Sequence, residues 1–254
     1  MLRWVLSQPI YNTVILINIT SLWQYCNMTP DNSLPNAPTR LVEATIRVLA
    51  TRGPSEVKAR SISSEAGLST MGVYTHFGGV PELLQAVADE GFKRLTEAFR
   101  RVPASADPVA DLCAMLLTCR DVAHSNPHLY DLMFGLSIDG RYSPSRGTMT
   151  PITEGQSAAF KATYAIVIEA CTRLVDGKFV RKTDPALIAH QLWSVAHGFI
   201  MLELAGHFAQ MDNPVQHIMV ATTINIAIGL GAKREKVEAS TAGVIARWES
   251  LTTG

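Results

Sequence analysis

Apolar side chains recur every three to four positions along most of the chain, which is the spacing of one face of an α-helix. Between Arg40 and Gly53, six mostly apolar positions fall within one arc of about 160° when residues are placed 100° apart, with Glu43 and Arg47 on the opposite side. Gly53-Pro54 ends this stretch, because glycine is favoured just past a helix and proline cannot continue one. The pattern predicts a helix with one buried face.

The same periodicity predicts helices through the rest of the chain. Two short ones, at roughly Val57–Ala66 and Thr70–Phe77, are separated by a turn at Gly67, where glycine permits a left-handed backbone. Longer helices are predicted at Pro81–Val102, Pro108–Asn126, His128–Leu136, Ser157–Asp176, Asp184–His207 and Pro214–Gly231, with a last one within Lys233–Gly254. Since no segment alternates between apolar and polar residues as a half-buried strand does, the predicted fold class is all-α.

Polar residues before several helices predict where those helices begin. Ser69 suits the N-cap of the helix Thr70–Phe77. Asp184-Pro185 and Asn213-Pro214 suit the pairing of an N-cap with a proline at the first helical position. Gly140–Gly155 is rich in turn residues and is predicted to be a mobile loop.

Lys58–Phe77 is the most informative stretch, because two short helices joined by a glycine-containing turn form a helix-turn-helix. In such a motif the second helix enters the DNA major groove. Helical geometry directs Val73 and Phe77 of this second helix toward the core. The opposite side of the helix is then left free to meet DNA.

That outward side carries the candidate DNA contacts. Met71, Gly72 and Thr75 face away from the core, and Tyr74 and His76 flank them. The methyl groups of Met71 and Thr75 suit thymine methyls, and glycine lets the backbone approach the duplex closely. A hydroxyl and an imidazole on the flanks suit phosphates, which position a protein on DNA, whereas base-edge contacts specify the sequence.

Charge is compatible with DNA binding but does not demonstrate it. The formal net charge is +0 at pH 7, so no field of the whole molecule attracts nucleic acid. Between Thr39 and Val80, five Lys or Arg residues stand against three Asp or Glu residues. Arg60, on the helix before the turn, is the best candidate for a bidentate contact to guanine.

Arg40–Val87 resembles the DNA-binding head of the TetR family. The resemblance rests on Ala50-x-Arg52-Gly53 at the end of the first helix, Glu-Ala-Gly-Leu-Ser at 65–69, Val-Tyr-Thr-His-Phe at 73–77 and Glu-Leu-Leu at 82–84. It implies phosphate contacts from Tyr74 and His76, and base or backbone contacts from Arg60, Thr70, Met71 and Thr75. The full predicted DNA-binding set is Arg40, Lys58, Arg60, Ser69, Thr70, Met71, Gly72, Tyr74, Thr75 and His76.

Three positions depart from the family pattern. The third position after Phe77 usually holds a phosphate-binding lysine in this family, and here it is Val80. Ser61 and Ser63 replace more typical acidic and small residues. These differences concern how strongly the head anchors to the DNA backbone, and not the fold.

The C-terminal part carries a weaker resemblance. Asn126–Phe134 followed by Trp193-x-x-x-His197-Gly198 resembles a TetR subfamily with a Trp…His-Gly signature. It implies a homodimer through the helices 184–207 and 214–231, with two recognition helices about 34–36 Å apart on a pseudo-palindromic double-stranded DNA operator. The predicted organisation is a disordered or mis-started leader at 1–35, a three-helix DNA-binding head at 36–88, and a helical ligand-binding and dimerisation body at 89–254.

The helix Asp184–His207 is apolar nearly all round, which predicts burial on more than one side, against a twin helix and an internal cavity. The composition agrees, since 47% of the residues are hydrophobic and 17% are charged. The candidate cavity residues are Met115, Met133, Phe134, Tyr164, Trp193 and His197, and ordinary core packing is the alternative for each. A pocket with few polar groups favours a small hydrophobic or aromatic effector.

Other chemistry finds little support in the sequence. The four cysteines lack CxxC spacing, so a cytoplasmic protein with reduced thiols is expected. His190 and His197 lie seven positions apart rather than at the i, i+4 spacing of a metal site, and no catalytic motif is present. No cofactor, metal ion or enzymatic activity is therefore predicted.

Three functional hypotheses stay open. The first is a DNA-binding repressor that a small effector releases by shifting the population of conformations. The second is an all-α enzyme or lipid carrier that keeps a decayed head. The third is a membrane-associated regulator anchored by Ile10–Trp23, although these 14 residues are interrupted by Asn12 and Asn18 and are too few to span a bilayer comfortably. Translation from Met28 would remove that segment.

Overall fold

The computed structural model describes residues 35–134 and 157–252, and within these ranges every regular element is helical. In chain order the elements are α2 (Ala37–Arg52), the 3-10 turn η1 (Pro54–Glu56), α3 (Ala59–Ala66), α4 (Met71–Phe77), α5 (Val80–Arg100), α6 (Pro108–Ser125), α7 (Pro127–Phe134), α8 (Ala158–Asp176), α9 (Pro185–Leu204), the π-helical segment η2 (Val215–Val220), α10 (Ala221–Gly229) and α11 (Arg234–Thr252). The all-α prediction is confirmed. The expectations for the leader, Ile10–Trp23 and Gly140–Gly155 fall outside the described residues, apart from Pro35.

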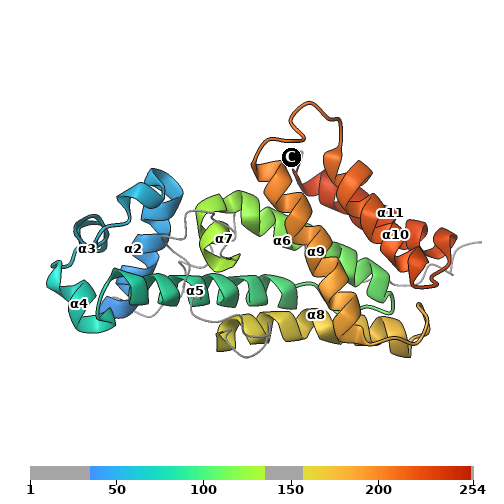
Figure 1. The fold of residues 1–254 in the computed structure, drawn as a ribbon, viewed down its shortest axis with the longest axis horizontal. Coiled ribbons are helices and arrows are strands. Elements are labelled where there is room, and N and C mark those ends of the chain that lie inside the picture. The colour runs from blue at the N-terminus through green and yellow to red at the C-terminus, as the bar shows by residue number, and fades with distance from the viewer. Residues whose placement is uncertain (1–34, 135–156, 253–254) are drawn as a thin grey trace, which may run out of the picture.

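Helices α2, α3 and α4 lie together at one end of the molecule, and α6 to α11 form the larger part (Figure 1). We call these parts the head and the body. Helix α5 runs through both, because its first half buries Leu83 and Val87 and its second half buries Leu95 and Phe99. The predicted boundary between residues 88 and 89 falls inside this helix, so head and body share one continuous element.

The predicted N-cap of α4 is wrong. Thr70, not Ser69, directly precedes the helix, its backbone is already helical, and no side chain caps this end. Ser69 instead accepts a hydrogen bond from the Gly72 N–H through its main-chain oxygen, at 2.9 Å. The first turn is therefore closed by backbone contacts rather than by a hydroxyl.

The two pairs of an N-cap with a proline have different outcomes. The Asp184 side chain accepts the Ala186 N–H at 2.9 Å, which confirms Asp184 as the N-cap of α9. Asn213 has a φ of +49°, and Pro214 rather than Asn213 is the cap residue of η2. Because N-cap residues ordinarily have β-region geometry, the prediction for Asn213 is wrong.

Helix α9 is buried on one side within the single chain. Ile188, Ala196 and Ile200 face the core, whereas Leu187 and Leu202 are 53% and 46% exposed. In the single chain, α9 is therefore not buried on more than one side as expected. A largely apolar stripe of this helix faces solvent.

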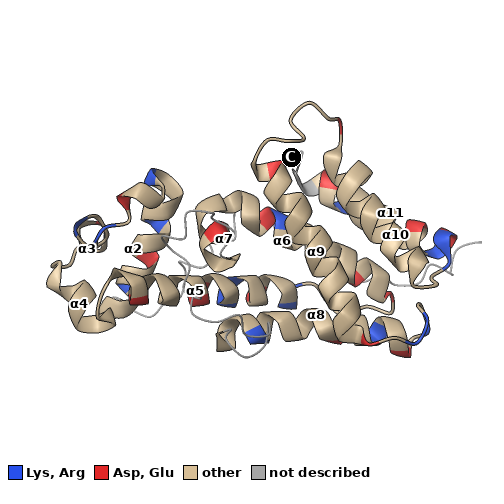
Figure 2. Ribbon diagram, in the orientation of Figure 1, with Lys and Arg blue, Asp and Glu red and all other residues tan. Residues whose placement is uncertain are grey.

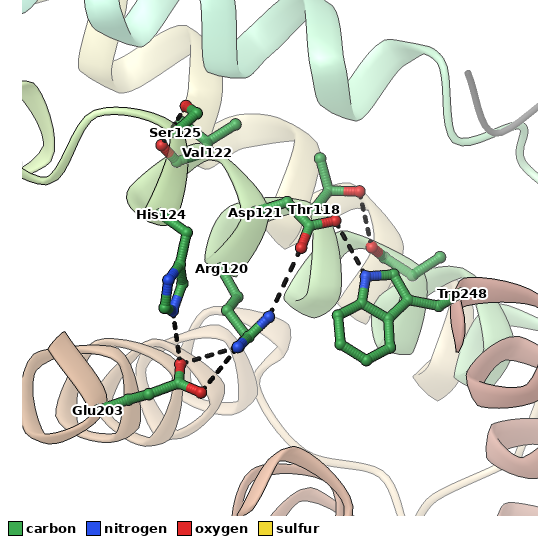
Figure 3. A network of polar contacts seen from close by, with 9 residues as sticks. Thr118, Arg120, Asp121, Val122, His124, Ser125, Glu203 and Trp248 are labelled. Atoms are coloured by element: carbon green, nitrogen blue, oxygen red, sulfur yellow. Dashed lines mark hydrogen bonds and ion pairs between the residues drawn. The ribbon is translucent and has the colours of Figure 1, made fainter. Parts of the chain in front are cut away.

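A polar network fastens α11 and α9 to α6 (Figure 3). The Arg120 guanidinium donates two hydrogen bonds of 2.8 Å to Glu203, and the His124 imidazole contacts the same carboxylate at 2.8 Å. The Trp248 indole N–H donates to Asp121 at 3.0 Å, and its ring lies 5.3 Å from the Arg120 guanidinium carbon. This network contributes to holding three helices of the body together.

Candidate DNA-binding surface and internal cavity

Helix α4 presents one face to solvent and one to the core, as predicted. Val73 is fully buried and Phe77 packs partly against the core. Met71 and Tyr74 are 68% and 51% exposed, and Thr75 and His76 are exposed beside them. Large apolar and aromatic side chains on an outward helix face are unusual for a surface whose only neighbour is water. The predicted orientation of the helix is confirmed, while the DNA contacts themselves stay predictions.

The turn between α3 and α4 is held by α2. Gly67 adopts the left-handed backbone with a φ of +63°, as expected from its position. Arg40 of α2 donates to the main-chain oxygens of Ala66 and Gly67 at 2.6 and 3.3 Å. Arg40 is in the predicted DNA-binding set, but the structure places its guanidinium on the end of α3, where it satisfies carbonyl groups that the helix leaves unpaired.

Ion pairs use most of the remaining positive charge of the head. Glu65 accepts hydrogen bonds from Arg47 at 3.0 Å and from Arg52 at 2.9 Å. Lys58, which precedes α3, is exposed and lies 3.3 Å from Glu56. Arg60 is exposed on α3, and no described residue forms a hydrogen bond or ion pair with it. Among the head cations that the structure describes, Arg60 is thus the one left available to a ligand.

The surface of α4 itself carries no formal charge (Figure 2). Ser69 and Thr70 are exposed at its start, and Gly72 is half-exposed. A Cβ added at Gly72 would lie 4.0 Å from the Leu68 Cβ, which is ordinary van der Waals contact. The fold therefore does not require glycine at this position. Glycine in fact lowers the stability of the helix relative to alanine.

The three departures from the family pattern have separate settings. Val80 opens α5 and packs partly against the core. Ser63 is buried and its hydroxyl has no hydrogen-bond partner among the described residues, whereas Ser61 is half-buried. Val80 contributes an apolar contact to the fold in place of a positive charge.

A partly open cavity of about 60 Å³ lies among α5, α6, α7, α8, α9 and α10. Four of the six predicted cavity residues line it, namely Met115, Phe134, Trp193 and His197. The lining that the sequence did not indicate is Leu95, Phe99, Leu112, Leu116, Cys119, Thr163, Val167, Leu192, Ala196 and Thr223. No formally charged residue is among these side chains, and the space is well below the ~300–1,000 Å³ of typical ligand pockets.

The other two predicted cavity residues lie elsewhere. Met133 packs against α5, where a Cβ added at Gly91 would come within 2.5 Å of its sulfur. Tyr164 stacks on Phe160 and meets the edge of Trp193, with ring centroids 5.8 and 5.2 Å apart. Neither side chain lines the cavity, although Tyr164 contacts the cavity residue Trp193.

His197 sits in an aromatic cluster at this cavity. Its ring centroid lies 4.2 Å from that of Trp193 and 4.3 Å from that of Phe134. The Tyr130 hydroxyl forms a short hydrogen bond with His197 Nδ1. Burial lowers the pKa of His197 to about 3, so the ring is neutral at physiological pH. A neutral imidazole offers one donor and one acceptor, which suits recognition of an uncharged polar group.

A larger cleft of about 510 Å³ separates the head from the body. Ile46 of α2 and Leu129, Tyr130 and Met133 of α7 contribute apolar lining, and α5 contributes charged side chains. Arg94 of α5 pairs with Glu43 and Glu90 across this wall. The cleft thus combines ion pairs with an apolar surface, whereas the smaller cavity is almost wholly apolar.

Two family models match the chain over these same regions. The one described as "Bacterial regulatory proteins, tetR family" matches residues 41–87, and the one described as "Tetracyclin repressor-like, C-terminal domain" matches residues 112–223. The chain belongs to the TetR family of transcriptional regulators. The matched ranges contain the helix-turn-helix of this TetR-family regulator. They also include at least part of every helix that lines its cavity.

Sequence relatives of the TetR-family chain include two HTH-type transcriptional regulators of Mycobacterium tuberculosis. One, described as uncharacterized, is 27% identical over 153 residues, which cover 54% of this chain and 78% of the relative. The other is 27% identical over 142 residues, which cover 54% of this chain and 60% of the relative. These relatives agree with a regulator that carries a helix-turn-helix.

Solved structures share the fold of this TetR-family protein. A protein of unknown function from Rhodococcus sp. RHA1 has a TM-score of 0.63 and 23% identity, covering 81% of this chain and all (100%) of its own. RolR in complex with resorcinol has a TM-score of 0.55 and 17% identity, covering 81% and 92%. The fatty acid degradation regulator FadR from Bacillus halodurans has a TM-score of 0.57 and 13% identity, covering 80% and 100%.

Family membership decides between two of the starting hypotheses. TetR-family proteins are DNA-binding transcription regulators and not enzymes, so the enzyme or lipid-carrier hypothesis is set aside. The hypothesis of a membrane anchor rests on Ile10–Trp23, which lies outside the described residues. Among the described helices, none is long and apolar enough to cross a membrane.

Proposed function

We propose that this TetR-family regulator is a cytoplasmic repressor that binds a pseudo-palindromic operator as a homodimer and is released by a small hydrophobic effector. The observation that carries the proposal is the division of α4 into a buried Val73 and an exposed, uncharged face. A face of that kind suits the major groove, where apolar groups meet thymine methyls and polar groups meet base edges.

Six of the ten predicted DNA contacts have a stated task in this proposal. Arg60, exposed and without a described partner, reads guanine through its two parallel N–H groups. Tyr74 and His76 bind phosphates on the flanks of the groove. Met71 and Thr75 contact base edges, and Gly72 lets the helix lie close to them. Specific readout by few side chains fits a head whose other positive charges are paired.

The exposed stripe of α9 supports the homodimer. Its exposed positions follow one another at the spacing of a helix–helix interface, namely Leu187, Gln191, Ser194, Gly198, Met201 and Ala205. Leu202 extends the apolar surface beside this stripe. Helix α10, which contacts α9, is apolar and has no fully buried residue of its own. A largely apolar exposed surface, here interrupted by Gln191 and Ser194, is typical of a protein interface, and a second copy of the same surface gives a twofold dimer.

The cavity at His197 supports a hydrophobic effector. Its lining offers aromatic and aliphatic surface with a neutral imidazole as the main polar group. No described residue bonds Nε2 of that imidazole, so a hydroxyl or carbonyl of the effector has a partner there. The structural relative RolR holds the aromatic diol resorcinol. Because the cavity measures about 60 Å³, an effector of that size has to displace wall side chains.

The head–body cleft is less suited to such a molecule. A hydrophobic effector there would cover the Arg94 ion pairs with Glu43 and Glu90 and remove water from them. Desolvating charges without new partners is unfavourable. We therefore assign the effector to the aromatic cavity.

A gel-shift titration with the intergenic DNA beside the protein's own gene tests the proposal. We expect specific binding by the wild type, and binding about ten-fold weaker or more for Tyr74→Ala, since that change removes a phosphate contact and packing area at the groove. Arg247→Ala, on the exposed side of α11, is the control and should bind as the wild type does. Equal binding by Tyr74→Ala would contradict the assignment of α4 to DNA.

A thermal-shift screen tests the effector assignment separately. Resorcinol and other small phenols are the first probes, and a compound that binds should raise the melting temperature and weaken the DNA complex. Ala196→Trp, which fills the cavity from α9, should abolish both effects. A compound that still releases this variant from DNA would have to bind elsewhere.

A further inference from the structure

Tyr130 lies between the aromatic cavity and the head–body cleft. It is 2% exposed, and its ring lines the cleft together with Ile46 of the head. Its hydroxyl forms a hydrogen bond with His197, which lines the aromatic cavity. One hydrogen-bonded pair therefore touches both spaces, one member on α7 and the other on α9.

Helix α7 in turn rests on the head. Asn126, directly before α7, is 2% exposed and donates to the main-chain oxygen of Ile46 at 3.4 Å. Its side-chain oxygen accepts the Leu129 N–H at 3.0 Å, so the same residue caps α7 and contacts α2. The His128 imidazole lies 3.7 Å from the position that a Cβ at Gly53 would take, at the end of α2.

Helix α2 is tied to the recognition elements. Arg40 binds the carbonyl oxygens at the end of α3, and Arg47 and Arg52 bind Glu65 on the same helix. The contacts thus run without a break from the cavity through His197, Tyr130, α7 and α2 to the turn before α4.

We propose that the hydrogen bond between Tyr130 and His197 couples the state of the aromatic cavity to the position of the head. Tyr130 is a positioning residue, since it lines the cavity at no point and acts through His197. The inference rests on the proposed function, because it explains how an effector in the cavity changes the affinity of α4 for DNA.

The chemistry of the pair makes it sensitive to a ligand. A ligand that displaces the His197 ring leaves the Tyr130 hydroxyl either to follow it or to stay buried without a partner. A buried hydroxyl without a partner is unfavourable, because it has lost its hydrogen bonds to water and gained none in the protein. Tyr130 therefore moves with His197, and α7 carries that movement to Ile46 and Gly53. Because the ring is neutral, the coupling acts through geometry rather than charge.

Amide hydrogen exchange of the full chain, followed by mass spectrometry, tests this without a known effector. The variants are Tyr130→Phe, His197→Phe and the double variant, which keep an aromatic ring at each position and remove the hydrogen bond. We expect exchange in α7 and in the C-terminal half of α2 to rise roughly three- to ten-fold, as loss of one buried hydrogen bond allows. Binding to the intergenic DNA should weaken about three-fold or more in the same variants.

The double variant and a control decide the interpretation. If the two residues act as a pair, the double variant shows no more effect than either single variant. Trp248→Phe is the control, because it removes the hydrogen bond between the Trp248 indole and Asp121, which joins α11 to α6. It should change exchange in the body and leave α2 as in the wild type. Near-ultraviolet circular dichroism checks that each variant is folded.

Several results would overturn the inference. Faster exchange confined to α7, with α2 and DNA binding unchanged, would make the pair a local structural contact. Additive effects of the two single variants would show that they act independently. Failure of the wild type to bind DNA would instead contradict the proposed function, and the exchange of α2 would still report on the pair.

Discussion

The head and the body of this regulator place their candidate functional side chains in opposite environments. In the head, the candidate DNA contacts of the seven-residue helix α4 are exposed, and Val73 alone of that helix is fully buried. In the body, the cavity side chains come from six helices, and residues such as Trp193 and His197 are buried or half-buried among aromatic rings. Substitutions on α4 can therefore change function without changing stability, whereas substitutions at the cavity change both. The body also has one exposed region with a proposed function, the stripe on α9, which provides the strongest test of this contrast.

The largest expected effect comes from that stripe. Leu187→Glu combined with Leu202→Glu places two negative charges on the proposed dimer surface, where each would be buried without a partner. We expect a folded monomer by light scattering and operator binding at least about 100-fold weaker, since both heads must bind together. Lys161→Glu on α8 changes the net charge equally and should stay dimeric. A dimeric double variant would place the interface elsewhere.

Arg60→Ala should have the next largest effect and should leave stability unchanged. Arg60 is exposed and makes no described contact that the fold depends on. Loss of a bidentate guanine contact is worth about 1–3 kcal/mol, or roughly a 5- to 150-fold loss of specific affinity. Competition with nonspecific DNA measures it, and specificity should relax at one base pair of each half-site. An unchanged sequence preference would remove Arg60 from base readout.

Glu203→Gln should have the opposite effect to Arg60→Ala, because it should lower the stability of the fold and leave the DNA contacts intact. Burial alone would raise the pKa of Glu203, but hydrogen bonds from Arg120 and His124 hold it below its usual value. The ionised carboxylate therefore stabilises the folded state above pH ~4.5, and this contribution is lost as the pH falls through the lowered pKa. Urea unfolding should show the variant less stable by about 1–3 kcal/mol at pH 7, and this difference should shrink as the pH falls through the lowered pKa of Glu203. Glu169→Gln, exposed on α8, is the control. A difference that stays the same as the pH falls would contradict this account.

Val80→Lys should have the smallest effect, and we expect it to increase the affinity for DNA. It restores the lysine typical of the family at the start of α5, beside the end of α4. One added phosphate contact should strengthen DNA binding a few-fold at low salt and steepen the salt dependence by about one unit of slope. Because Val80 packs partly against the core, a small loss of stability accompanies the gain. An unchanged slope would mean that this position does not reach the DNA backbone.

The contrast between head and body also explains what the sequence could predict. The orientation of α4 follows from helical periodicity and a local turn, so the exposure of Met71 and Tyr74 and the burial of Val73 were predictable. Arg40 is in the predicted DNA-binding set, and the sequence did not indicate its partners within the protein. Those partners are main-chain oxygens 26 and 27 positions away in the sequence, which no local pattern contains.

In the body, the helices were predictable and their crossings were not. Met115 and Trp193 line the cavity as expected. Met133 instead packs against α5, where Gly91 leaves room for its side chain. Thr163 lines the cavity although it is polar, since its hydroxyl bonds the main-chain oxygen of Phe92 at 3.0 Å. Which residues line the cavity depends on how six helices cross. The periodicity within one helix carries no information about those crossings.

The most direct test of the central claim is the affinity of Gly72→Leu for the operator, measured beside its melting temperature. A Cβ at Gly72 makes only ordinary van der Waals contact, with Leu68, and leucine favours a helix more than glycine does, so we expect the melting temperature to stay equal or rise. On the DNA side the leucine would hold α4 away from the groove, and we predict at least about a 100-fold loss of specific binding, by analogy with the loss of several base contacts. A variant that is equally stable and binds the operator as tightly as the wild type would contradict the claim that this face of α4 reads DNA.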